Sequence, residues 1–165
     1  MAKMIVMGIN EYTRKLEKLG KSGEKIAGKA IYSAAGIVAD KIKENISSLE
    51  TVSDTENLRA YKNGGKSRLT VRQKADLLSS FGISPMEMDD KGYYNVKLGF
   101  DGYNSIRTKK YPKGQPNQLI ARVVESGSSY MDKQPFIRTA VQSAKKSAEE
   151  EMQRVIDEET KKIMR

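Results

Sequence analysis

The stretch R-V-V-E-S-G-S-S-Y-M-D-K-Q-P-F, residues 122–136, joins two apolar patterns and decides how they are arranged. The apolar run within 118–126 closes at Glu125, and Gly127 stands between two serines. Residues of the run that alternate fit a strand, whereas its adjacent apolar pairs fit one face of a helix. Asn117 as an N-terminal cap and Gly127 just past the end favour a short helix, with a strand as the alternative.

Pro135 opens a second helical pattern, which continues to the C-terminus. Proline suits the first helical turn because its missing N–H would have no partner there. The apolar stripe of the pattern consists of Ile137, Val141, Ala144, Ala148, Met152, Val155 and Ile163. A helix of this length would reach about 45 Å, which is longer than a small domain is wide. We therefore expect part of it to pack on another subunit or to stand in solvent, with residues 122–136 setting its angle.

Two further helices are expected at the start of the chain. Residues 9–19 carry apolar side chains at helical spacing, and Gly20 should end this helix. Residues 23–47 continue with a stripe of Ile26, Ala30, Ala34, Ile37, Val38, Ile42 and Ile46. The alanines on this stripe would let another backbone approach closely.

The central part predicts a small sheet between long loops. Thr70 can cap a short helix, and alternation up to Phe100 indicates a β-hairpin over about 83–100 with its turn at D-D-K-G. Residues 47–68 and 101–117 have no sustained period and are expected to be long, flexible surface loops. The expected fold is α+β, a single domain over 1–165, with long N-terminal and C-terminal amphipathic helices packed on a small antiparallel sheet.

Composition excludes several classes of function. The 165 residues, enough for one domain, include no His and no Cys, while apolar residues make up 38% and charged residues 31%. Serine triads, Cys–His dyads and most zinc or iron sites are thereby excluded. No apolar run approaches the roughly 18 to 20 residues of a membrane span, so neither a membrane partner nor secretion from the cytoplasm is expected.

Three short motifs resemble catalytic or ligand sites but lack essential parts. E-S-G-S-S lacks the flanking glycines of a nucleophile elbow. N-G-G-K-S-R at 63–68 has Ala60 where a phosphate-binding loop has its first glycine, and D-D-K-G lacks the distal Glu of a calcium loop. We expect no catalytic, cofactor, metal or small-molecule site; an enzyme using carboxylates and Mg²⁺ is the weakest of the alternatives.

The positive charge is unevenly distributed. The net charge of +9 divides into +4 over residues 1–47, +5 over 48–140 and zero over 141–165. The most basic stretch is R-T-K-K-Y-P-K, whose cations are Arg107, Lys109, Lys110 and Lys113. Four cations around a Tyr could contact phosphates and stack on bases, so this loop is a candidate contact for DNA or for a protein partner.

Several motifs, in their order, resemble a known family. K-A-D-L-L-S-S-F-G-I, V-K-L-G-F-D-G-Y-N, V-E-S-G-S at 124–128 and P-F-I-R-T-A at 135–140 resemble the small tail-completion, or head-tail joining, proteins of tailed phages and prophages. The last two motifs are the most specific. The matching positions are Glu125, Gly127, Ser128, Pro135, Phe136, Arg138 and Ala140. Thr139 stands where such proteins often carry Pro, so a smoother start of the helix is expected here.

The resemblance implies a non-enzymatic virion part at the tail end or neck, assembled in the bacterial cytoplasm as a homo-oligomeric ring, by analogy a hexamer. Tail tube, terminator and head connector proteins would be its partners. A ring uses two different patches of each subunit, for which we expect the C-terminal helix stripe and the 47–68 loop. The alternative function is a small basic nucleic-acid-binding protein.

Overall fold

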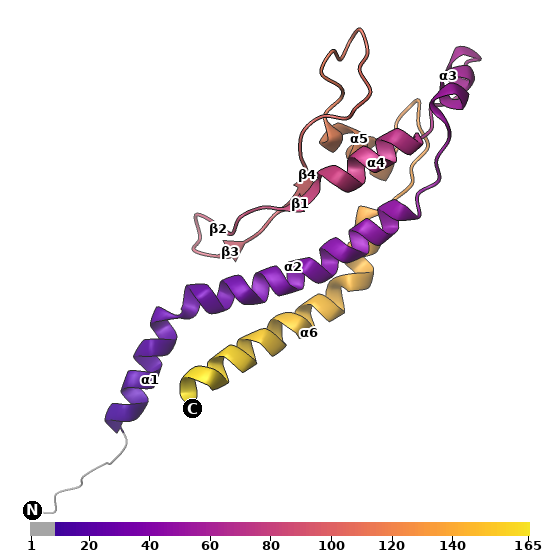
Figure 1. Cartoon of the computed structure of the whole chain (residues 1–165). Coiled ribbons are helices and arrows are strands. Elements are labelled where there is room, and N and C mark those ends of the chain that lie inside the picture. The colour runs from indigo at the N-terminus through magenta and orange to yellow at the C-terminus, as the bar shows by residue number, and fades with distance from the viewer. Residues whose placement is uncertain (1–8) are drawn as a thin grey trace, which may run out of the picture.

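The computed structural model describes residues 9–165, with side chains from Thr13 onward, and has the mixed α+β architecture predicted from the sequence. The elements are α1 (Ile9–Lys21), α2 (Gly23–Ser47), α3 (Asp54–Lys62), α4 (Val71–Ser80), β1 (Phe81–Ile83), β2 (Glu87–Met88), β3 (Tyr94–Asn95), β4 (Leu98–Phe100), α5 (Asn117–Ser126) and α6 (Ile137–Met164). Figure 1 shows an elongated molecule in which α4 and α5 lie near the C-terminal end of α2, while β1 and β4 lead to the β2–β3 pair, which extends over the N-terminal half of α2.

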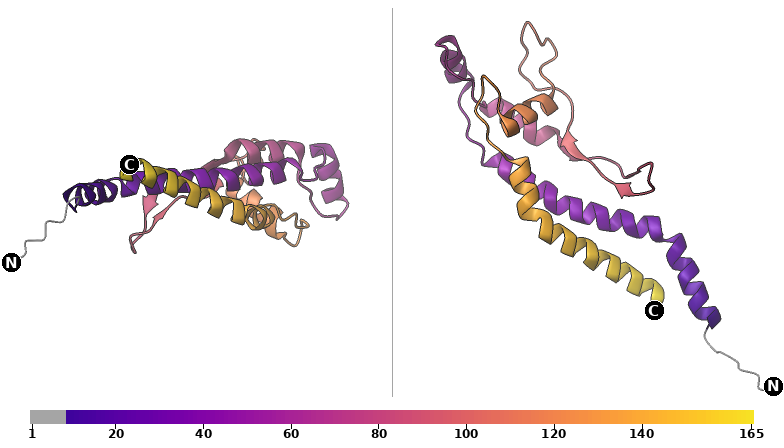
Figure 2. Two further views of the ribbon diagram at one scale, coloured as in Figure 1. Left: turned by 90° about the horizontal axis from the view of Figure 1, so that it is seen from below. Right: turned by 180° about the vertical axis from the view of Figure 1, so that it is seen from behind.

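Helices α2 and α6 lie side by side and antiparallel, and we call them the helical pair (Figures 1 and 2). The small side chains of Ala140, Ala144 and Ala148 form the buried face of α6. The buried face of α2 is likewise rich in alanine and consists of Ile26, Ala30, Ala34, Ala35, Ala39, Ile42 and Ile46. The buried face of α6 therefore packs on α2 of the same chain, whereas another subunit or solvent was expected to cover part of this helix. Val141, expected in the apolar stripe of α6, is 43% exposed.

Helix α1 extends further than predicted. It passes through Gly20 and ends at Lys21, where the Ser22 N–H donates to the carbonyls of Lys18 and Leu19 at 3.1 Å each. Glycine is tolerated here because it stands in the final turn of a helix that is about to end. The side chains of Ile9 and Tyr12, expected on its apolar face, lie outside the described residues, as does the segment before Ile9.

The core lies where the C-terminal half of α2 meets α4, α5, the sheet and the start of α6. Ile46, Leu69, Leu77, Val124 and Phe136 are its most completely buried large side chains. The three phenylalanines of the chain form one line through it. The ring of Phe100 lies 5.1 Å from that of Phe81 and 6.1 Å, edge to face, from that of Phe136. Aromatic packing thus connects the sheet to the first turn of α6.

The predicted hairpin is present but divided into two antiparallel pairs, β1 with β4 and β2 with β3. Pro85 interrupts the ladder because it has no N–H to donate. Next to it the Ser84 hydroxyl replaces a backbone acceptor and takes the N–H of Lys97 at 2.8 Å. The turn lies at D-D-K-G as expected, with Gly92 at φ 82°. The short helix predicted before it is α4, capped by Thr70 in a reciprocal capping box with Gln73.

The segment 47–68 is not one irregular loop, because it contains helix α3. The hydroxyl of Ser53 accepts the N–H of Glu56 at 3.1 Å and so caps this helix. The nine residues of α3 include none that is buried, so the apolar stripe by which a helix is normally found in a sequence is absent. The second expected loop, 101–117, contains no helix or strand up to residue 116, and α5 begins at its last residue, Asn117.

The short helix expected over 118–126 is present as α5, so the helical alternative for this segment is correct. Asn117 is not its cap, however, because the cap position is held by Pro116. The buried side chain of Asn117 instead donates to the carbonyl of Asp101 at 2.9 Å and ties the helix to the end of β4. The last helix begins at Ile137, two residues later than expected from Pro135.

Two carboxylates of α6 fasten the far end of the helical pair. Glu151 accepts from Arg154 at 2.7 Å and from the hydroxyl of Ser33 on α2. Glu159 pairs with Lys162 at 2.7 Å and with Lys29 on α2 at 2.8 Å. Hydrogen bonds from Arg154 and Ser33 lower the pKa of Glu151 from 4.5 to about 2, and those from Lys162 and Lys29 lower the pKa of Glu159 to about 2.

We predict that acid weakens the helical pair. Because both pKa values are lower in the folded protein, their stabilisation is fully present above about pH 4.5 and is lost as the pH falls towards about 2. The urea midpoint of the wild type should fall across this window, whereas that of the Glu151→Gln, Glu159→Gln protein should start lower and change less. Glu149→Gln with Glu150→Gln, on the exposed face, is the control; an equal loss of pH dependence there would contradict the assignment.

Candidate functional site

The joint, residues 125–138, connects α5 to α6 and contains most of the positions singled out in the sequence. The backbone reverses at Gly127, whose φ is 75°, and its N–H closes α5 by donating to the Val123 carbonyl at 2.8 Å. A tight turn follows, in which the Ser128 N–H donates to the carbonyl of Met131 at 2.8 Å. The Ser128 hydroxyl accepts the N–H of Tyr130 at 3.3 Å, so this serine stabilises a turn.

Glu125 is the central residue of the joint, because its carboxylate caps helix α6. One oxygen accepts the N–H groups of Phe136 and Ile137 at 2.7 and 2.8 Å, and the other accepts that of Arg138 at 3.0 Å. These are among the N–H groups that a helix start leaves without an intrahelical partner. Phe136, at the cap position, provides no side-chain cap of its own. A carboxylate placed here also interacts favourably with the positive end of the helix dipole.

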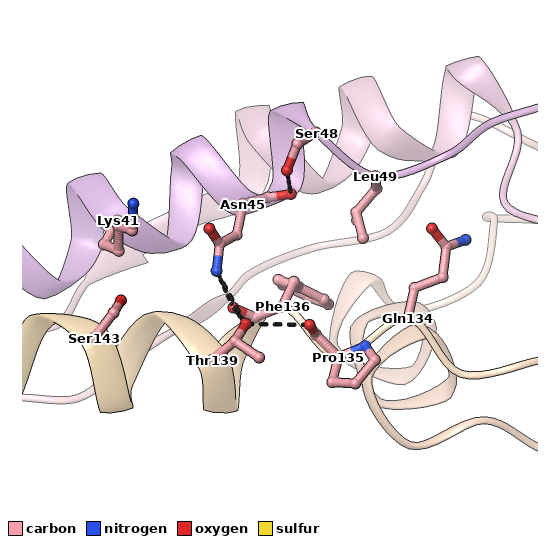
Figure 3. A pocket seen from close by; sticks show the side chains of 9 residues that line it. All are labelled: Lys41, Asn45, Ser48, Leu49, Gln134, Pro135, Phe136, Thr139 and Ser143. Atoms are coloured by element: carbon pink, nitrogen blue, oxygen red, sulfur yellow. Dashed lines mark hydrogen bonds between the residues drawn. The ribbon is translucent and has the colours of Figure 1, made fainter.

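Gln134 and Asn45 hold the other side of the joint. The Gln134 side chain exchanges two hydrogen bonds with the backbone of Glu50, at 2.9 and 3.3 Å, and its own N–H donates to Val124 at 2.7 Å. The amide of Asn45 on α2 donates to the carbonyl of Phe136 at 2.9 Å. Figure 3 shows these side chains around an open cleft of about 430 Å³. Hydrogen bonds from three segments therefore fix the first turn of α6.

The other motif residues contribute through packing or backbone. Phe136 is buried, with 1% of its surface exposed, and so is Ala140. The side chains of Pro135 and Arg138 are exposed, so Arg138 takes part in the joint through its N–H alone. Thr139 donates to the carbonyl of Pro135 at 3.1 Å within the first turn. The hydrogen bonds of Gln134 and Asn45 were not predicted, because the groups that they bind are distant in sequence.

The four basic candidates lie elsewhere, on loop 101–116. Arg107, Lys109, Lys110 and Lys113 are exposed, and none of them has an ion-pair partner among the described residues. The only ring contact among them is that of the Lys110 ammonium, 5.5 Å from the centre of the Tyr111 ring. Figures 1 and 2 show the loop projecting at the end of the molecule that also carries α3 and the turn of the joint.

The base of this loop is rigidly built. Buried Asn104 accepts the Gln115 N–H at 2.8 Å through its side chain and donates its own N–H to the Gln115 carbonyl at the same distance. Gly114 has φ 94°, and an added Cβ would lie 2.1 Å from the Asn104 carbonyl oxygen. Only glycine fits this position. The loop therefore presents its cations from a fixed base.

The remaining motifs have structural roles. Lys66 of N-G-G-K-S-R pairs with Asp132 of the joint, and the Ser67 N–H donates to the carbonyl of Tyr130 at 2.7 Å. Asp89 accepts two N–H groups within its own turn. Over the described residues there is no group of three acidic side chains arranged to hold a metal ion, and no helix there is long and apolar enough to cross a membrane.

We predict that Glu125→Ala destabilises the protein by about 1 to 3 kcal/mol, because it removes the acceptor from N–H groups next to a buried phenylalanine. Glu125→Gln keeps one acceptor oxygen and should cost less. Urea unfolding measures both, with Ser126→Ala as an exposed neighbouring control. Equal stability of Glu125→Ala and the wild type would refute the capping role.

Gly127→Val should destabilise the joint for two reasons. A β-branched residue is strained at φ 75°, and an added Cβ would lie 3.1 Å from the Lys133 nitrogen. We expect a loss of about 1 to 3 kcal/mol in unfolding experiments. Gly82→Val is the matched control, because Gly82 lies in a strand with no atom near its Cβ position; similar losses in both variants would contradict this reading.

Comparison with known proteins agrees with the resemblance seen in the sequence. The model of the family HK97-gp10_like, described as "Bacteriophage HK97-gp10, putative tail-component", matches residues 10–127. This range covers most of the chain and ends at Gly127, so α6 lies outside it. No curated relative and no solved structure matches the chain. The family match extends over more than two thirds of the sequence, and the chain belongs to the HK97 gp10-like family of phage tail components.

Proposed function

We propose that this protein is a non-enzymatic structural part of a phage or prophage virion that completes the tail end or joins tail to head. It acts as a homo-oligomeric ring, of six subunits by analogy with tail-completion proteins. Its neighbours are the tail tube or terminator protein on one side and the head connector on the other. It is assembled in the cytoplasm of the bacterial host and resides in the neck or tail of the particle.

The proposal of a ring rests on the large solvent-accessible surface of the single chain. Its accessible surface is 11,859 Å², whereas a compact monomer of 18.5 kDa exposes about 8,200 Å². Even with about 1,300 Å² set aside for the eight residues before α1, the excess exceeds about 2,000 Å². Obligate interfaces bury areas of this size, so contacts with neighbouring copies would account for the elongated shape.

A ring requires two different patches on each subunit. One is an apolar cleft of about 470 Å³ where α2, β4, α5 and α6 meet, and Val141 lies exposed on its rim. We propose that a neighbouring copy covers this cleft. Ile137 and Val141 of the expected α6 stripe line this cleft, whereas Ala144 and Ala148 of the same stripe are buried in the helical pair. The joint then sets the angle between the cleft and the rest of α6.

A second candidate, nucleic-acid binding, is favoured only by the unpaired cations of loop 101–116. Such contacts would depend strongly on salt, because each phosphate neutralised releases counterions. A neck protein could line a channel for DNA, so weak binding is compatible with the ring. Charge reversal at Lys109 and Lys110 separates the two candidates. Loss of particle assembly with unchanged DNA affinity would favour the structural role, whereas loss of DNA affinity with intact assembly would favour nucleic-acid binding by this loop.

The ring is tested by light scattering and negative-stain imaging, with and without the tail tube protein. Rings are expected in at least one condition, and Val141→Arg should abolish them without unfolding the chain, because it places a charge in the apolar cleft. Val71→Arg is the matched control, since Val71 is also exposed but lies at the start of α4. A strict monomer in both conditions that still restores tail completion in a deletion phage would refute the ring.

A further inference from the structure

Helix α3 presents apolar side chains that the rest of the described chain covers only in part. Leu58 and Tyr61, three residues apart on one face, are 53% and 63% exposed. A nine-residue helix without packing is marginal in water, since most helical stability comes from a buried face. Here the helix is fixed mainly at its base, where the Asn57 side chain accepts the Arg68 N–H at 2.7 Å. An ordered helix with an uncovered apolar face indicates a binding surface.

This face forms one wall of a groove that we call the α3 groove. Loop 101–116 supplies the opposite wall through Ile106, Lys110 and Tyr111, and the floor includes Thr70 and Gln73 at the start of α4. The groove has a volume of about 620 Å³ and is lined mainly by apolar surface. Both walls are held in place, α3 by Asn57 and the loop by its glycine-dependent base. The groove is therefore preformed, as peptide-binding grooves generally are.

The charge around the α3 groove is strongly positive. Residues 54–76 and 101–116 contain ten basic and four acidic residues, a net +6 out of the +9 of the chain. The acidic groups are already engaged: Asp54 pairs with Arg72 at 3.3 Å, and Asp76 accepts from Ser105. Around the groove, the exposed cations that have no ion-pair partner within the described part of the chain are Arg59, Lys62, Arg107, Lys109, Lys110 and Lys113. An occupant must therefore bring negative charge.

We propose that the α3 groove binds an acidic, amphipathic segment of another virion protein, whose aliphatic or aromatic side chains cover Leu58 and Tyr61 and whose carboxylates face the surrounding cations. This occupant replaces the ring contact that was expected of residues 47–68. It does not come from a second copy, because the acidic clusters of α6 are neutralised along their own helix, Glu149 and Glu150 by Lys145 and Lys146 and Glu158 by Arg154. A protein segment fits better than DNA, because an aliphatic groove wall offers no favourable contact to phosphates.

This inference deepens the proposed structural role by stating the chemistry of one partner. The direct test is fluorescence titration of the full chain with a labelled 14-residue probe of alternating Glu and Leu or Phe. We expect saturable micromolar binding that weakens with salt, since the contacts are partly ionic. A second probe, with Ser in place of Leu and Phe, should bind at least about tenfold more weakly, because it cannot fill the apolar wall.

Two pairs of variants locate the site. Leu58→Ser with Tyr61→Ser, both at exposed positions, should weaken the probe at least about tenfold while preserving the melting temperature. Lys109→Glu with Lys110→Glu should weaken it by a similar factor and reduce its salt dependence. Tyr93→Ser and Lys91→Glu are matched controls, because Tyr93 is 69% exposed and the β2–β3 turn that carries both residues lies far from α3 (Figure 1).

Three results would overturn the inference: no saturation by the acidic probe at about 1 mM, equal losses in the hairpin controls, or a duplex DNA oligonucleotide that binds more tightly and is insensitive to changes at Leu58 and Tyr61. The last result would assign the surface to nucleic acid. Tail completion measured in a deletion phage tests the virion role separately from the acidic partner. A chain that completes tails but ignores the probe refutes the acidic partner and leaves the virion role intact.

Discussion

Three backbone N–H groups and one carboxylate determine the geometry of this protein. Helix α6 starts with donors that no preceding residue of its own helix can satisfy, and Glu125 accepts three of them from the end of α5. Helices α5 and α6 are thereby fixed relative to each other at the corner where they meet. Because α6 then runs along most of α2, a small change of angle at this corner would move its far end by several ångströms. The packing between the alanine-rich faces of α2 and α6 tolerates no such change, since small side chains leave little room for adjustment between close backbones.

The corner is connected to the core by burial. Phe136, whose N–H bonds to Glu125, is also the last ring in the aromatic line through Phe81 and Phe100. The sheet, α5 and α6 therefore share one packing unit, and the cap lies at its edge. At the opposite end, the ion pair of Glu159 and the hydrogen bond of Glu151 add to the apolar packing of α2 through Ile26, Ala30 and Ala34. These polar contacts are partly exposed, so they are weak and sensitive to salt and pH.

Local signals explain what could be predicted. The stripe of α2, the Thr70 cap and the glycine after α5 each act within a few residues, and the structure contains all three. The contacts that were missed span longer separations. The Glu125 cap joins residues 11 to 13 apart across an irregular turn, and α6 meets α2 across some 90 or more positions. Asn117 is a residue type that often caps helices, but its side-chain amide donates a hydrogen bond to the carbonyl of Asp101. Helix α3 escaped detection because its apolar residues face a groove and have no buried stripe.

The distribution of charge is consistent with this division of the molecule. The C-terminal segment 141–165 has no net charge, whereas the end formed by α3, the start of α4 and loop 101–116 carries most of the excess. Copies placed side by side along their helical pairs would therefore meet with little repulsion. Like-charged ends at the same radius of a ring would repel one another unless an acidic neighbour lay between them. A basic surface kept at one end favours contact with a different molecule, while the nearly neutral helical pair and the apolar cleft beside the joint suit the proposed contacts between copies of the chain.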